Sequence, residues 1–374
     1  MAGIYIHIPF CHSKCYYCDF YSRPCKNGTE TLAGQYIKAL ACEWQMRCNE
    51  ISQPITTLYI GGGTPSAIPP ELYSYILQFL PLENVTEFTV EANPEDVTPR
   101  WAATVKSLGV NRISMGVQSM IHTELESVGR RHTPADAVNA YLTLRSAGFD
   151  NISLDLIYGL PKQTPESWEY SLNKLLSLRP EHLSAYSLTY EEGTRLNAMR
   201  LAGKIAPATD DTVVAMYQKL CKLTEDAGYR HYEISNFALP DMYARHNSSY
   251  WDFSPYIGLG VAAHSFDGKN TRRSNPADIQ LYIKAMESGQ CFALTEQESI
   301  YDIYNDYVIT GLRTHSGISN EKMQLRFGPE LVQRFVNDLQ KHIAAGSIEK
   351  SHGRWRIAPD SWLISDAILR DIII

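Results

Sequence analysis

The cysteines near the start of the chain are the residues whose type and spacing most directly indicate chemistry. Cys11, Cys15 and Cys18 form a C-x3-C-x2-C motif in one short segment. Such a segment can place three thiolates around one inorganic core, and iron–sulfur clusters are held by cysteine thiolates. Three ligands leave one iron of a four-iron cluster open, and an open position is what a catalytic metal needs. The spacing therefore predicts a 4Fe–4S cluster.

A zinc site is the alternative for the same cysteines, with Cys25, His12 or Asp19 as a fourth ligand. Structural zinc is commonly bound by two separated ligand pairs, and the sequence offers no matching second pair. The spacing alone favours the cluster, and it leaves the role of Cys25 open. The four other cysteines stand alone, which is typical of small buried hydrophobic residues; they are Cys42, Cys48, Cys221 and Cys291.

Composition and charge restrict the class of protein. The chain has 374 residues, of which 44% are hydrophobic and 20% charged, as in an ordinary globular protein. A net charge of −7 argues against nucleic acid as the main partner. No apolar run is long enough to span a bilayer, and the first residues do not read as a signal peptide. We therefore expect a cytoplasmic protein that contacts a membrane only through a partner.

Alternating strand and helix patterns in the first two-thirds of the chain must position these cysteines. Six consecutive βα units predict a parallel sheet covered by helices. Six is fewer than the eight of a closed barrel, so we predict an α/β fold with a partial (β/α)6 barrel. The predicted strands are 3–8, 56–61, 87–92, 112–117, 151–157 and 182–189, and the predicted helices are 31–48, one from about Pro70, 98–108, 134–147, 165–178 and 210–228.

The last third of the chain is less regular. A further strand is predicted over 231–238, and helices over 300–312 and 329–345 precede a hairpin at His352. Helices with a hairpin resemble a winged helix, but residues 300–374 carry nine acidic and nine basic side chains, so we expect packing or a lid rather than DNA binding. The predicted regions are a core (1–236), a connecting region (237–299) and a small C-terminal domain (300–374).

Polar or glycine residues occur at the end of every predicted strand. In parallel βα folds the ligand site lies at the carboxyl ends of the strands. Each residue alone could simply complete a turn, but six consecutive strand ends predict one site across the mouth of the barrel. These positions are Cys11, Gly61 to Thr64, Glu91, Gln118, Asp155 and Thr189 to Glu191.

The cysteine motif and its surroundings resemble the radical S-adenosylmethionine (SAM) family, and within it the HemN/HemW group of coproporphyrinogen III oxidases and haem chaperones. The resemblance covers nearly the whole chain and favours the cluster over zinc. It rests on the segments YIHIPFC (5–11), GGGTP (61–65), EANP (91–94), GVQS (116–119) and DLIYGLP (155–161).

The resemblance implies that the open iron binds the amino and carboxylate groups of SAM, and that an electron from the cluster breaks a carbon–sulfur bond. The cofactor supplies this chemistry and the protein positions it. Glycines would allow close backbone approach, and Arg130 would bind a carboxylate bidentately. The cofactor contacts implied by the resemblance are Tyr5, Tyr17, Gly62, Gly63, Thr64, Glu91, Gln118, Arg130, Asp155, Ile157 and Thr189.

Two features distinguish the subgroups of this family. The oxidases carry a fourth cysteine two residues after the third, where this chain has Phe20. They also carry an extension before the signature, whereas here the signature begins at Tyr5. Both departures favour similarity to the HemW-type haem chaperones.

A second motif, HNxxYW at 246–251, fits the pattern associated with haem in HemW-type proteins. Histidine can ligate haem iron, and tyrosine and tryptophan offer flat apolar surfaces to a porphyrin. His246, Tyr250 and Trp251 are therefore candidate haem residues, with an aromatic domain junction as the alternative. His264 is a second possible ligand, but we expect a buried structural histidine there.

The leading hypothesis is a haem chaperone that retains the cluster and the SAM site, takes electrons from a donor and delivers haem to an unidentified acceptor protein. The alternative is an enzyme that converts coproporphyrinogen III to protoporphyrinogen IX. A radical enzyme with an unrelated substrate is a third hypothesis, and the sequence does not decide whether the chain is an enzyme.

Overall fold

A curved, mixed sheet organises the fold in a computed structural model that describes residues 1–26, 28–290 and 293–374. Cys291 lies outside these ranges. The sheet has twelve strands in the order β14-β13-β12-β11-β1-β4-β5-β6-β7-β8-β10-β9. They are β1 (Ala2–Ile8), β4 (Ile55–Gly62), β5 (Glu87–Ala92), β6 (Arg112–Gln118), β7 (Ile152–Tyr158), β8 (His182–Ser187), β9 (Arg230–Glu233), β10 (Asn236–Ala238), β11 (Tyr256–Leu259), β12 (His264–Phe266), β13 (Thr271–Ser274) and β14 (Leu294–Gln297).

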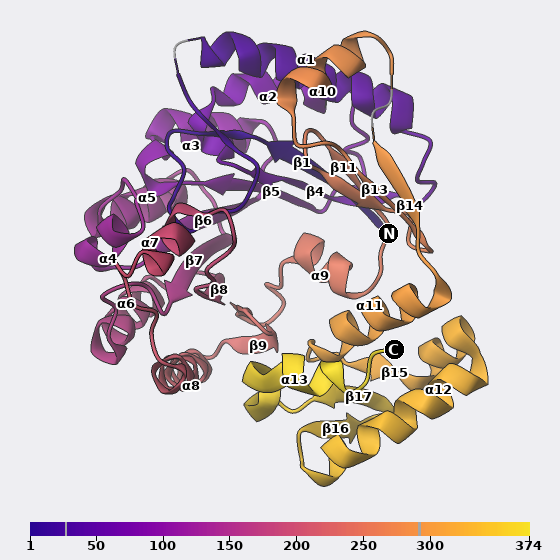
Figure 1. Cartoon of the computed structure of the whole chain (residues 1–374). Helices are drawn as coiled ribbons and strands as arrows, with labels where there is room; N and C mark the ends of the chain where they lie inside the picture. Colours follow the sequence, from indigo (N-terminus) through magenta and orange to yellow (C-terminus); the bar gives the residue numbers. More distant parts are fainter. Residues whose placement is uncertain (27, 291–292) are drawn as a thin grey trace.

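Six consecutive parallel strands, β1 and β4 to β8, confirm the predicted partial barrel. Figure 1 shows the sheet curving around an open interior, with helices along its outer side. The free edge of β1 is filled by β11, which pairs with it in parallel, and β12 to β14 continue antiparallel. The predicted connecting region 237–299 therefore contributes strands to the barrel's own sheet.

Thr-Pro pairs begin three of the outer helices. In α3, α5 and α6 a threonine side chain accepts from a backbone N–H in the first turn, and proline takes the first helical position. Both choices suit a helix start, because the cap satisfies a free N–H and proline needs none. The helices of the barrel are α1 (Thr29–Arg47), α2 (Tyr73–Leu77), α3 (Pro99–Ser107), α4 (His122–Ser127), α5 (Pro134–Ser146), α6 (Pro165–Leu178), α7 (Arg195–Leu201), α8 (Asp210–Asp226), α9 (Arg245–Trp251) and α10 (Ile279–Glu287), with 3-10 turns at Pro65–Ala67, Pro70–Leu72 and Pro94–Asp96.

Some predicted elements differ in the structure. The strand predicted over 231–238 is two antiparallel strands, β9 and β10, because the chain reverses at Ile234 and Ser235. The helix predicted from Pro70 is a 3-10 turn followed by the short α2, and α7 was not predicted. A separate pair of short strands, β2 (Phe10–Cys11) and β3 (Arg23–Pro24), encloses the cysteine motif.

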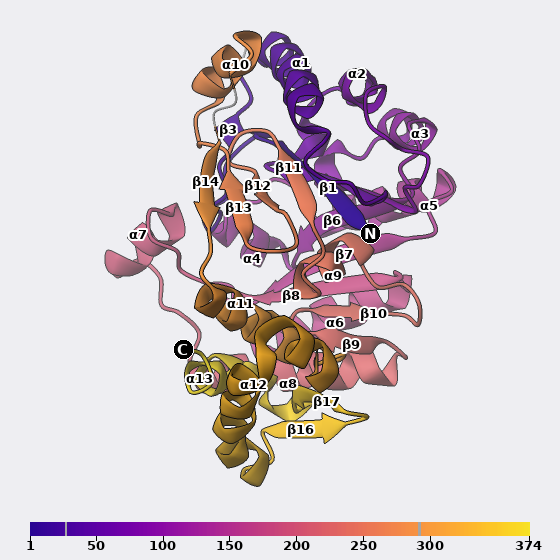
Figure 2. The same ribbon diagram turned by 90° about the vertical axis from the view of Figure 1, so that its right-hand side faces the viewer.

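The C-terminal unit confirms the predicted helical, winged-helix-like domain. A three-stranded sheet packs with helices, and α12 is kinked at Gly328, where φ is 75°. Figures 1 and 2 show this unit below the open side of the barrel. Within the described residues, no helix combines the length and the apolar character needed to cross a membrane. The elements are α11 (Ile300–Leu312), β15 (Ile318–Ser319), α12 (Asn320–Ala344), β16 (Ile348–Ser351), β17 (Arg354–Ile357), a 3-10 turn (Pro359–Ile364) and α13 (Ser365–Arg370).

Candidate metal centre and adjoining cavity

The loop that carries the three cysteines is anchored at its middle by Tyr16. Its backbone N–H donates to the Val128 carbonyl at 2.9 Å, and its carbonyl accepts from the Leu196 N–H at 2.7 Å. The guanidinium carbon of Arg195 lies 3.8 Å from the centroid of the Tyr16 ring, a cation–π contact. A Cβ on Gly129 would lie 2.6 Å from that ring, so a larger residue would displace it. The loop is thus held from both α4 and α7.

The three thiols lie close enough together for the charge of Cys18 to interact with those of Cys11 and Cys15. Thr64 Oγ1 donates to Cys11 Sγ at 3.2 Å, and Arg130 Nη1 donates to Cys15 Sγ at 3.6 Å. Burial raises the pKa of the Cys11 thiol, and it raises the pKa of Cys18 to about 11. Both thiols are therefore protonated at neutral pH, and binding a metal as thiolates must release protons.

This donor set fits an iron–sulfur cluster better than a single metal ion. Over the described ranges, no three His, Cys, Asp or Glu side chains converge to hold one ion. Two residues considered for zinc are engaged elsewhere: His12 pairs with Asp96 at 3.0 Å, and Cys25 Sγ faces the Ala67 carbonyl at 4.0 Å. Thiolates on different corners of a cluster need not meet at one point, so three adjacent thiols on one loop can serve it.

The glycine turn after β4 packs against the strand that leads to Cys11. Gly62 has a φ of 108°, and a Cβ there would lie 2.5 Å from His7 Nδ1. A Cβ on Gly63 would lie 2.8 Å from the Ile8 carbonyl oxygen, which accepts the Gly63 N–H at 2.8 Å. Contacts within the chain therefore require glycine here, independently of any approach to a cofactor.

Glu91 is half-buried at the carboxyl end of β5, beside this turn. It accepts hydrogen bonds from the Tyr59 hydroxyl at 2.7 Å and from the Gly62 N–H at 3.0 Å. Burial, with a smaller contribution from the Asp155 carboxylate, raises the pKa of Glu91 to about 7 despite these bonds. The ring of Tyr5 lies 6.1 Å from that of Tyr59. An ionised Glu91 would attract an amino group at this position.

Gln118 and Arg130 meet at Gly116. Gln118 has a φ of 66°, and a Cβ on Gly116 would lie 2.7 Å from its Nε2. Arg130 Nη2 donates to the Gly116 carbonyl at 2.5 Å and to Asn93 Oδ1 at 2.8 Å. The bidentate carboxylate contact predicted for Arg130 is therefore not available in this arrangement, because both protons on Nη2 are used within the chain. Instead, Arg130 steadies Cys15.

The remaining predicted cofactor contacts are not all brought together. Asp155 accepts from the Ser114 hydroxyl at 3.2 Å, and burial raises its pKa. Ile157 is buried in a small apolar cluster with Tyr17, next to the cysteine loop. Burial raises the pKa of Tyr17. Thr189 is exposed beyond the end of β8, and no side-chain hydrogen bond joins it to the described part of the chain.

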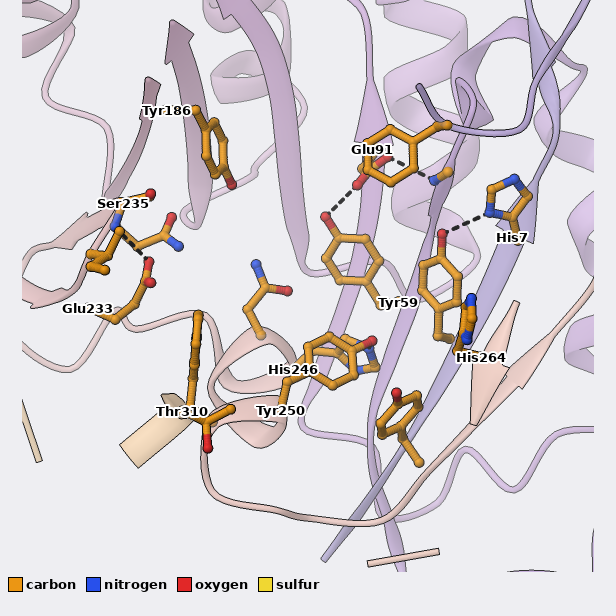
Figure 3. A pocket seen from close by; sticks show the side chains of 18 of the residues that line it. His7, Tyr59, Glu91, Tyr186, Glu233, Ser235, His246, Tyr250, His264 and Thr310 are labelled. Atoms are coloured by element: carbon orange, nitrogen blue, oxygen red, sulfur yellow. Dashed lines mark hydrogen bonds between the residues drawn. The ribbon is translucent and has the colours of Figure 1, made fainter. Parts of the chain in front are cut away.

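A cavity of about 790 Å³ extends from Glu91 towards the C-terminal unit. Small-molecule sites commonly measure about 300–1,000 Å³, so the cavity can admit a large planar ligand. Figure 3 shows His246, Tyr250 and Tyr59 near the middle of the view, with Glu233 and His264 on opposite sides. The lining residues are Tyr5, His7, Phe20, Tyr21, Tyr59, Gly62, Glu91, Tyr186, Glu233, Ile234, Ser235, Asn236, His246, Asn247, Tyr250, Trp251, Tyr256, Ala262, His264, Thr310 and Arg313.

Helix α9 places the HNxxYW motif on the wall of this cavity. His246 is 1% exposed and stacks on Tyr59, with ring centroids 5.1 Å apart. Its Nδ1 lies 2.9 Å from Thr57 Oγ1 and its Nε2 lies 2.8 Å from the Tyr250 hydroxyl. Burial lowers the pKa of His246 to about 3, so its ring is neutral. Tyr250 and Trp251 are half-buried lining residues.

His264 differs from the sequence-based expectation. A buried structural histidine was expected, but His264 is exposed at the first residue of β12 and lines the cavity. The sequence also gave no signal for Glu233 and Arg313, which line the same cavity. Glu233 ends a short strand without a motif, and Arg313 reaches the cavity only because the C-terminal unit folds back against the barrel.

Both units of the chain match known protein families. The profile of the radical SAM superfamily matches residues 5–175, and that of the HemN C-terminal domain matches 301–364. The chain is 34% identical to the heme chaperone HemW of Bacillus subtilis over 94% of this chain and 93% of that protein. It is 36% identical to the heme chaperone HemW of Lactococcus lactis over 86% and 84%, respectively.

A solved structure also matches this chain along its whole length. Coproporphyrinogen III oxidase (HemN) from Escherichia coli superimposes with a TM-score of 0.83 and covers 100% of this chain and 90% of its own, at 23% sequence identity. The match shows that the two proteins share a fold.

Proposed function

The chain belongs to the HemW family within the radical SAM superfamily, and from this membership we propose that it binds haem in the cavity beside its cofactor site and passes it to an acceptor protein. Superfamily membership implies a 4Fe–4S cluster and SAM. The proposal requires an electron donor for the cluster and a recipient for the haem.

The aromatic wall of the cavity is the observation that carries this proposal. Successive ring contacts join Tyr5, Tyr59, His246, Tyr250 and Tyr256, with centroids 4.7 to 6.1 Å apart. These rings come from β1, β4, α9 and β11, so the barrel and the connecting region together build one aromatic wall, in which neighbouring rings are stacked, tilted or edge to face. Porphyrins bind by burying their faces against such surfaces. In this arrangement Tyr250 and Trp251 contact the haem, and His246 holds Tyr250 in place.

The cluster and SAM are assigned to the rim of the barrel next to this cavity. Cys11, Cys15 and Cys18 would hold the cluster, with Arg130 steadying Cys15. Glu91, which the Gly62 N–H fixes in position, would receive the amino group of SAM. The other residues of the proposed SAM site are Tyr5, Tyr17, Gly63, Thr64, Gln118, Asp155, Ile157 and Thr189.

Phe20 favours a chaperone over the oxidase alternative. Its side chain is 60% exposed and lines the cavity at the position where the oxidase pattern has a fourth cysteine. An exposed phenyl ring is unfavourable in water and gains free energy when a planar apolar ligand covers it. The position therefore supplies ligand-binding surface instead of a fourth thiol.

Anaerobic reconstitution followed by haem titration, with and without SAM, tests the proposal. We expect saturable uptake of haem and no conversion of coproporphyrinogen III to protoporphyrinogen IX by the same sample. The Cys15→Ala variant should lose the broad absorbance near about 400 nm expected of a thiolate-bound cluster, whereas Cys48→Ala, a cysteine outside the site, should keep it. Repeated turnover to protoporphyrinogen IX would establish the oxidase instead.

A further inference from the structure

Three histidines line the cavity, and they differ in whether a ring nitrogen is free. A histidine that ligates iron must direct an unprotonated nitrogen lone pair at the metal. The hydrogen bonds and exposure of His7, His246 and His264 therefore decide which of them can serve.

His7 and His246 have both ring nitrogens engaged. In His7, Nε2 lies 2.9 Å from the Tyr21 carbonyl oxygen and Nδ1 lies 3.1 Å from the Tyr5 hydroxyl. In His246, the partners are a threonine and a tyrosine hydroxyl, as described above. Both residues are at most 3% exposed. Turning either ring towards a ligand would break hydrogen bonds and leave buried polar groups unpaired, which is unfavourable.

His264 is free and is presented on a rigid support. Its ring is exposed, and it has no hydrogen-bond partner in the described part of the chain. The chain on either side is fixed: Asn275 N–H donates to the Ala263 carbonyl at 2.9 Å, and Gly258 N–H donates to Ser265 Oγ at 3.0 Å. Arg47, which is buried, donates to the same Ser265 oxygen at 2.8 Å.

The tyrosines of the aromatic wall do not compete for iron, because their hydroxyls are already engaged, that of Tyr256 with Arg272. The Tyr59 hydroxyl donates to Glu91, and the hydroxyls of Tyr5 and Tyr250 are bonded to histidines. Neither cysteine nor methionine occurs among the lining residues. On this basis, and resting on the proposed function, we propose that His264 is the axial ligand of the haem iron, in place of the histidine of the HNxxYW motif.

Arg313 completes the site by pairing with a haem propionate. Arg313 is the only lysine or arginine among the described residues that line the cavity. One end of its guanidinium pairs with Asp366, while its Nε is buried and has no partner among the described residues. A propionate carboxylate would satisfy that Nε, and arginine binds carboxylates strongly. Haem would therefore lie between β12 and the end of α11, in contact with both units of the chain.

The ligand assignment is tested by the spectrum and affinity of the haem complex of the reconstituted full-length protein. His264→Ala should shift the Soret band and weaken ferric haem binding at least about tenfold, equivalent to about 1.4 kcal/mol. Added imidazole should restore the wild-type spectrum by filling the vacated coordination position. The matched control is His122→Ala, because His122 is exposed on α4 and does not line the cavity.

The outcomes separate this inference from the proposed function. The ligand assignment is wrong if His264→Ala binds haem with an unchanged spectrum and affinity, and most clearly so if His246→Gln changes that spectrum and affinity while His264→Ala does not. Haem binding itself would still stand. If the wild-type protein takes up no haem, the proposed function itself is wrong.

The propionate contact has its own comparison, between haem and its dimethyl ester. Arg313→Met should lose affinity for haem but not for the ester, and Asp366→Asn should retain both. Equal losses for the two ligands would overturn the role of Arg313.

Discussion

Two carboxyl groups on the cavity wall have pKa values raised towards neutrality. Burial is the largest cause for both Glu91 and Glu233, and it raises each pKa to about 7. Glu233 is 2% exposed, accepts from the Ser235 N–H and faces Arg313, Tyr186 and Tyr232. Because the folded pKa lies above the ordinary value of 4.5, the folded chain holds a proton that the unfolded chain has lost between these two pH values. Stability therefore falls as pH rises from about 4.5 to 7.

Replacing Glu233 by glutamine should remove the part of this pH dependence of stability that comes from Glu233. The free energy of unfolding of Glu233→Gln, relative to wild type, should increase by about 2 kcal/mol between pH 5.5 and pH 8. Urea denaturation of the metal-free protein at both pH values measures it. Buried histidines with lowered pKa values, such as His246, titrate equally in both proteins and cancel in the difference. A difference that does not change with pH would show that Glu233 does not titrate near neutrality.

The roles of residues in a recognisable motif could be predicted from the sequence, whereas the residues that they contact could not. The cysteine motif and the glycine turn were recognisable because their spacing constrains a loop. The partners of Arg130, Asn93 and Gly116, could not be predicted, because they come from other βα units. The exposure of His264 depends on Gly258 and its neighbours, which let β12 approach β11 closely.

At the scale of elements, α1 is tied to the turn between β11 and β12 by a buried ionic network. Arg47 donates to Glu43 at 2.7 Å, to the Gly258 carbonyl at 2.9 Å and to Ser265. Glu43 also accepts from the Tyr282 hydroxyl of α10 at 2.7 Å. A buried charge whose partner is removed is strongly destabilising, because the remaining charge is left in an apolar environment.

Arg47→Met should lower the free energy of unfolding by about 3–5 kcal/mol, measured by chemical denaturation. The same variant should broaden or shift the Soret band of bound haem, because the support of His264 is lost. The control is Arg100→Met, which removes a pair between Arg100 and Glu71 that is 84% and 46% exposed. That change should cost less than about 1 kcal/mol. Equal effects of the two substitutions would contradict the role of the network.

Elements with local signals were predicted well, and those set by distant contacts were not. Thr-Pro caps mark α3, α5 and α6 in the sequence itself. The reversal between β9 and β10 lacks glycine and proline, so the segment reads as one strand. Helix α7 is short and polar on one side, and it is held by its contact with the cysteine loop.

At the scale of the whole molecule, the C-terminal unit closes the open side of the barrel. The His315 N–H donates to the Tyr232 carbonyl at 2.9 Å, Glu233 forms an isolated β-bridge with Thr314, and the rings of His231 and Trp362 are 4.1 Å apart. The cavity is therefore built from both units. No local pattern in the sequence could predict this arrangement, because the contacting segments are separated by more than eighty residues along the chain.

Haem binding should protect both units from hydrogen exchange. We expect slower amide exchange in residues 233–236 and 310–313 as well as in the aromatic wall when haem is added to the reconstituted protein, as measured by mass spectrometry. Residues of α3 on the outer side of the barrel provide the internal control and should not change. Protection confined to the barrel would show that the C-terminal unit does not contact the ligand.

The position of β1 in the sheet has a consequence for synthesis. Its neighbours are β4 and β11, so this strand has both partners only after residue 259 has left the ribosome. The anchor of the cysteine loop at Leu196 also arrives late. At about 5–20 residues per second, the three thiols spend on the order of ten seconds or more on an incomplete nascent chain. Metal loading that requires the finished loop must therefore wait until the chain has been made at least as far as Leu259.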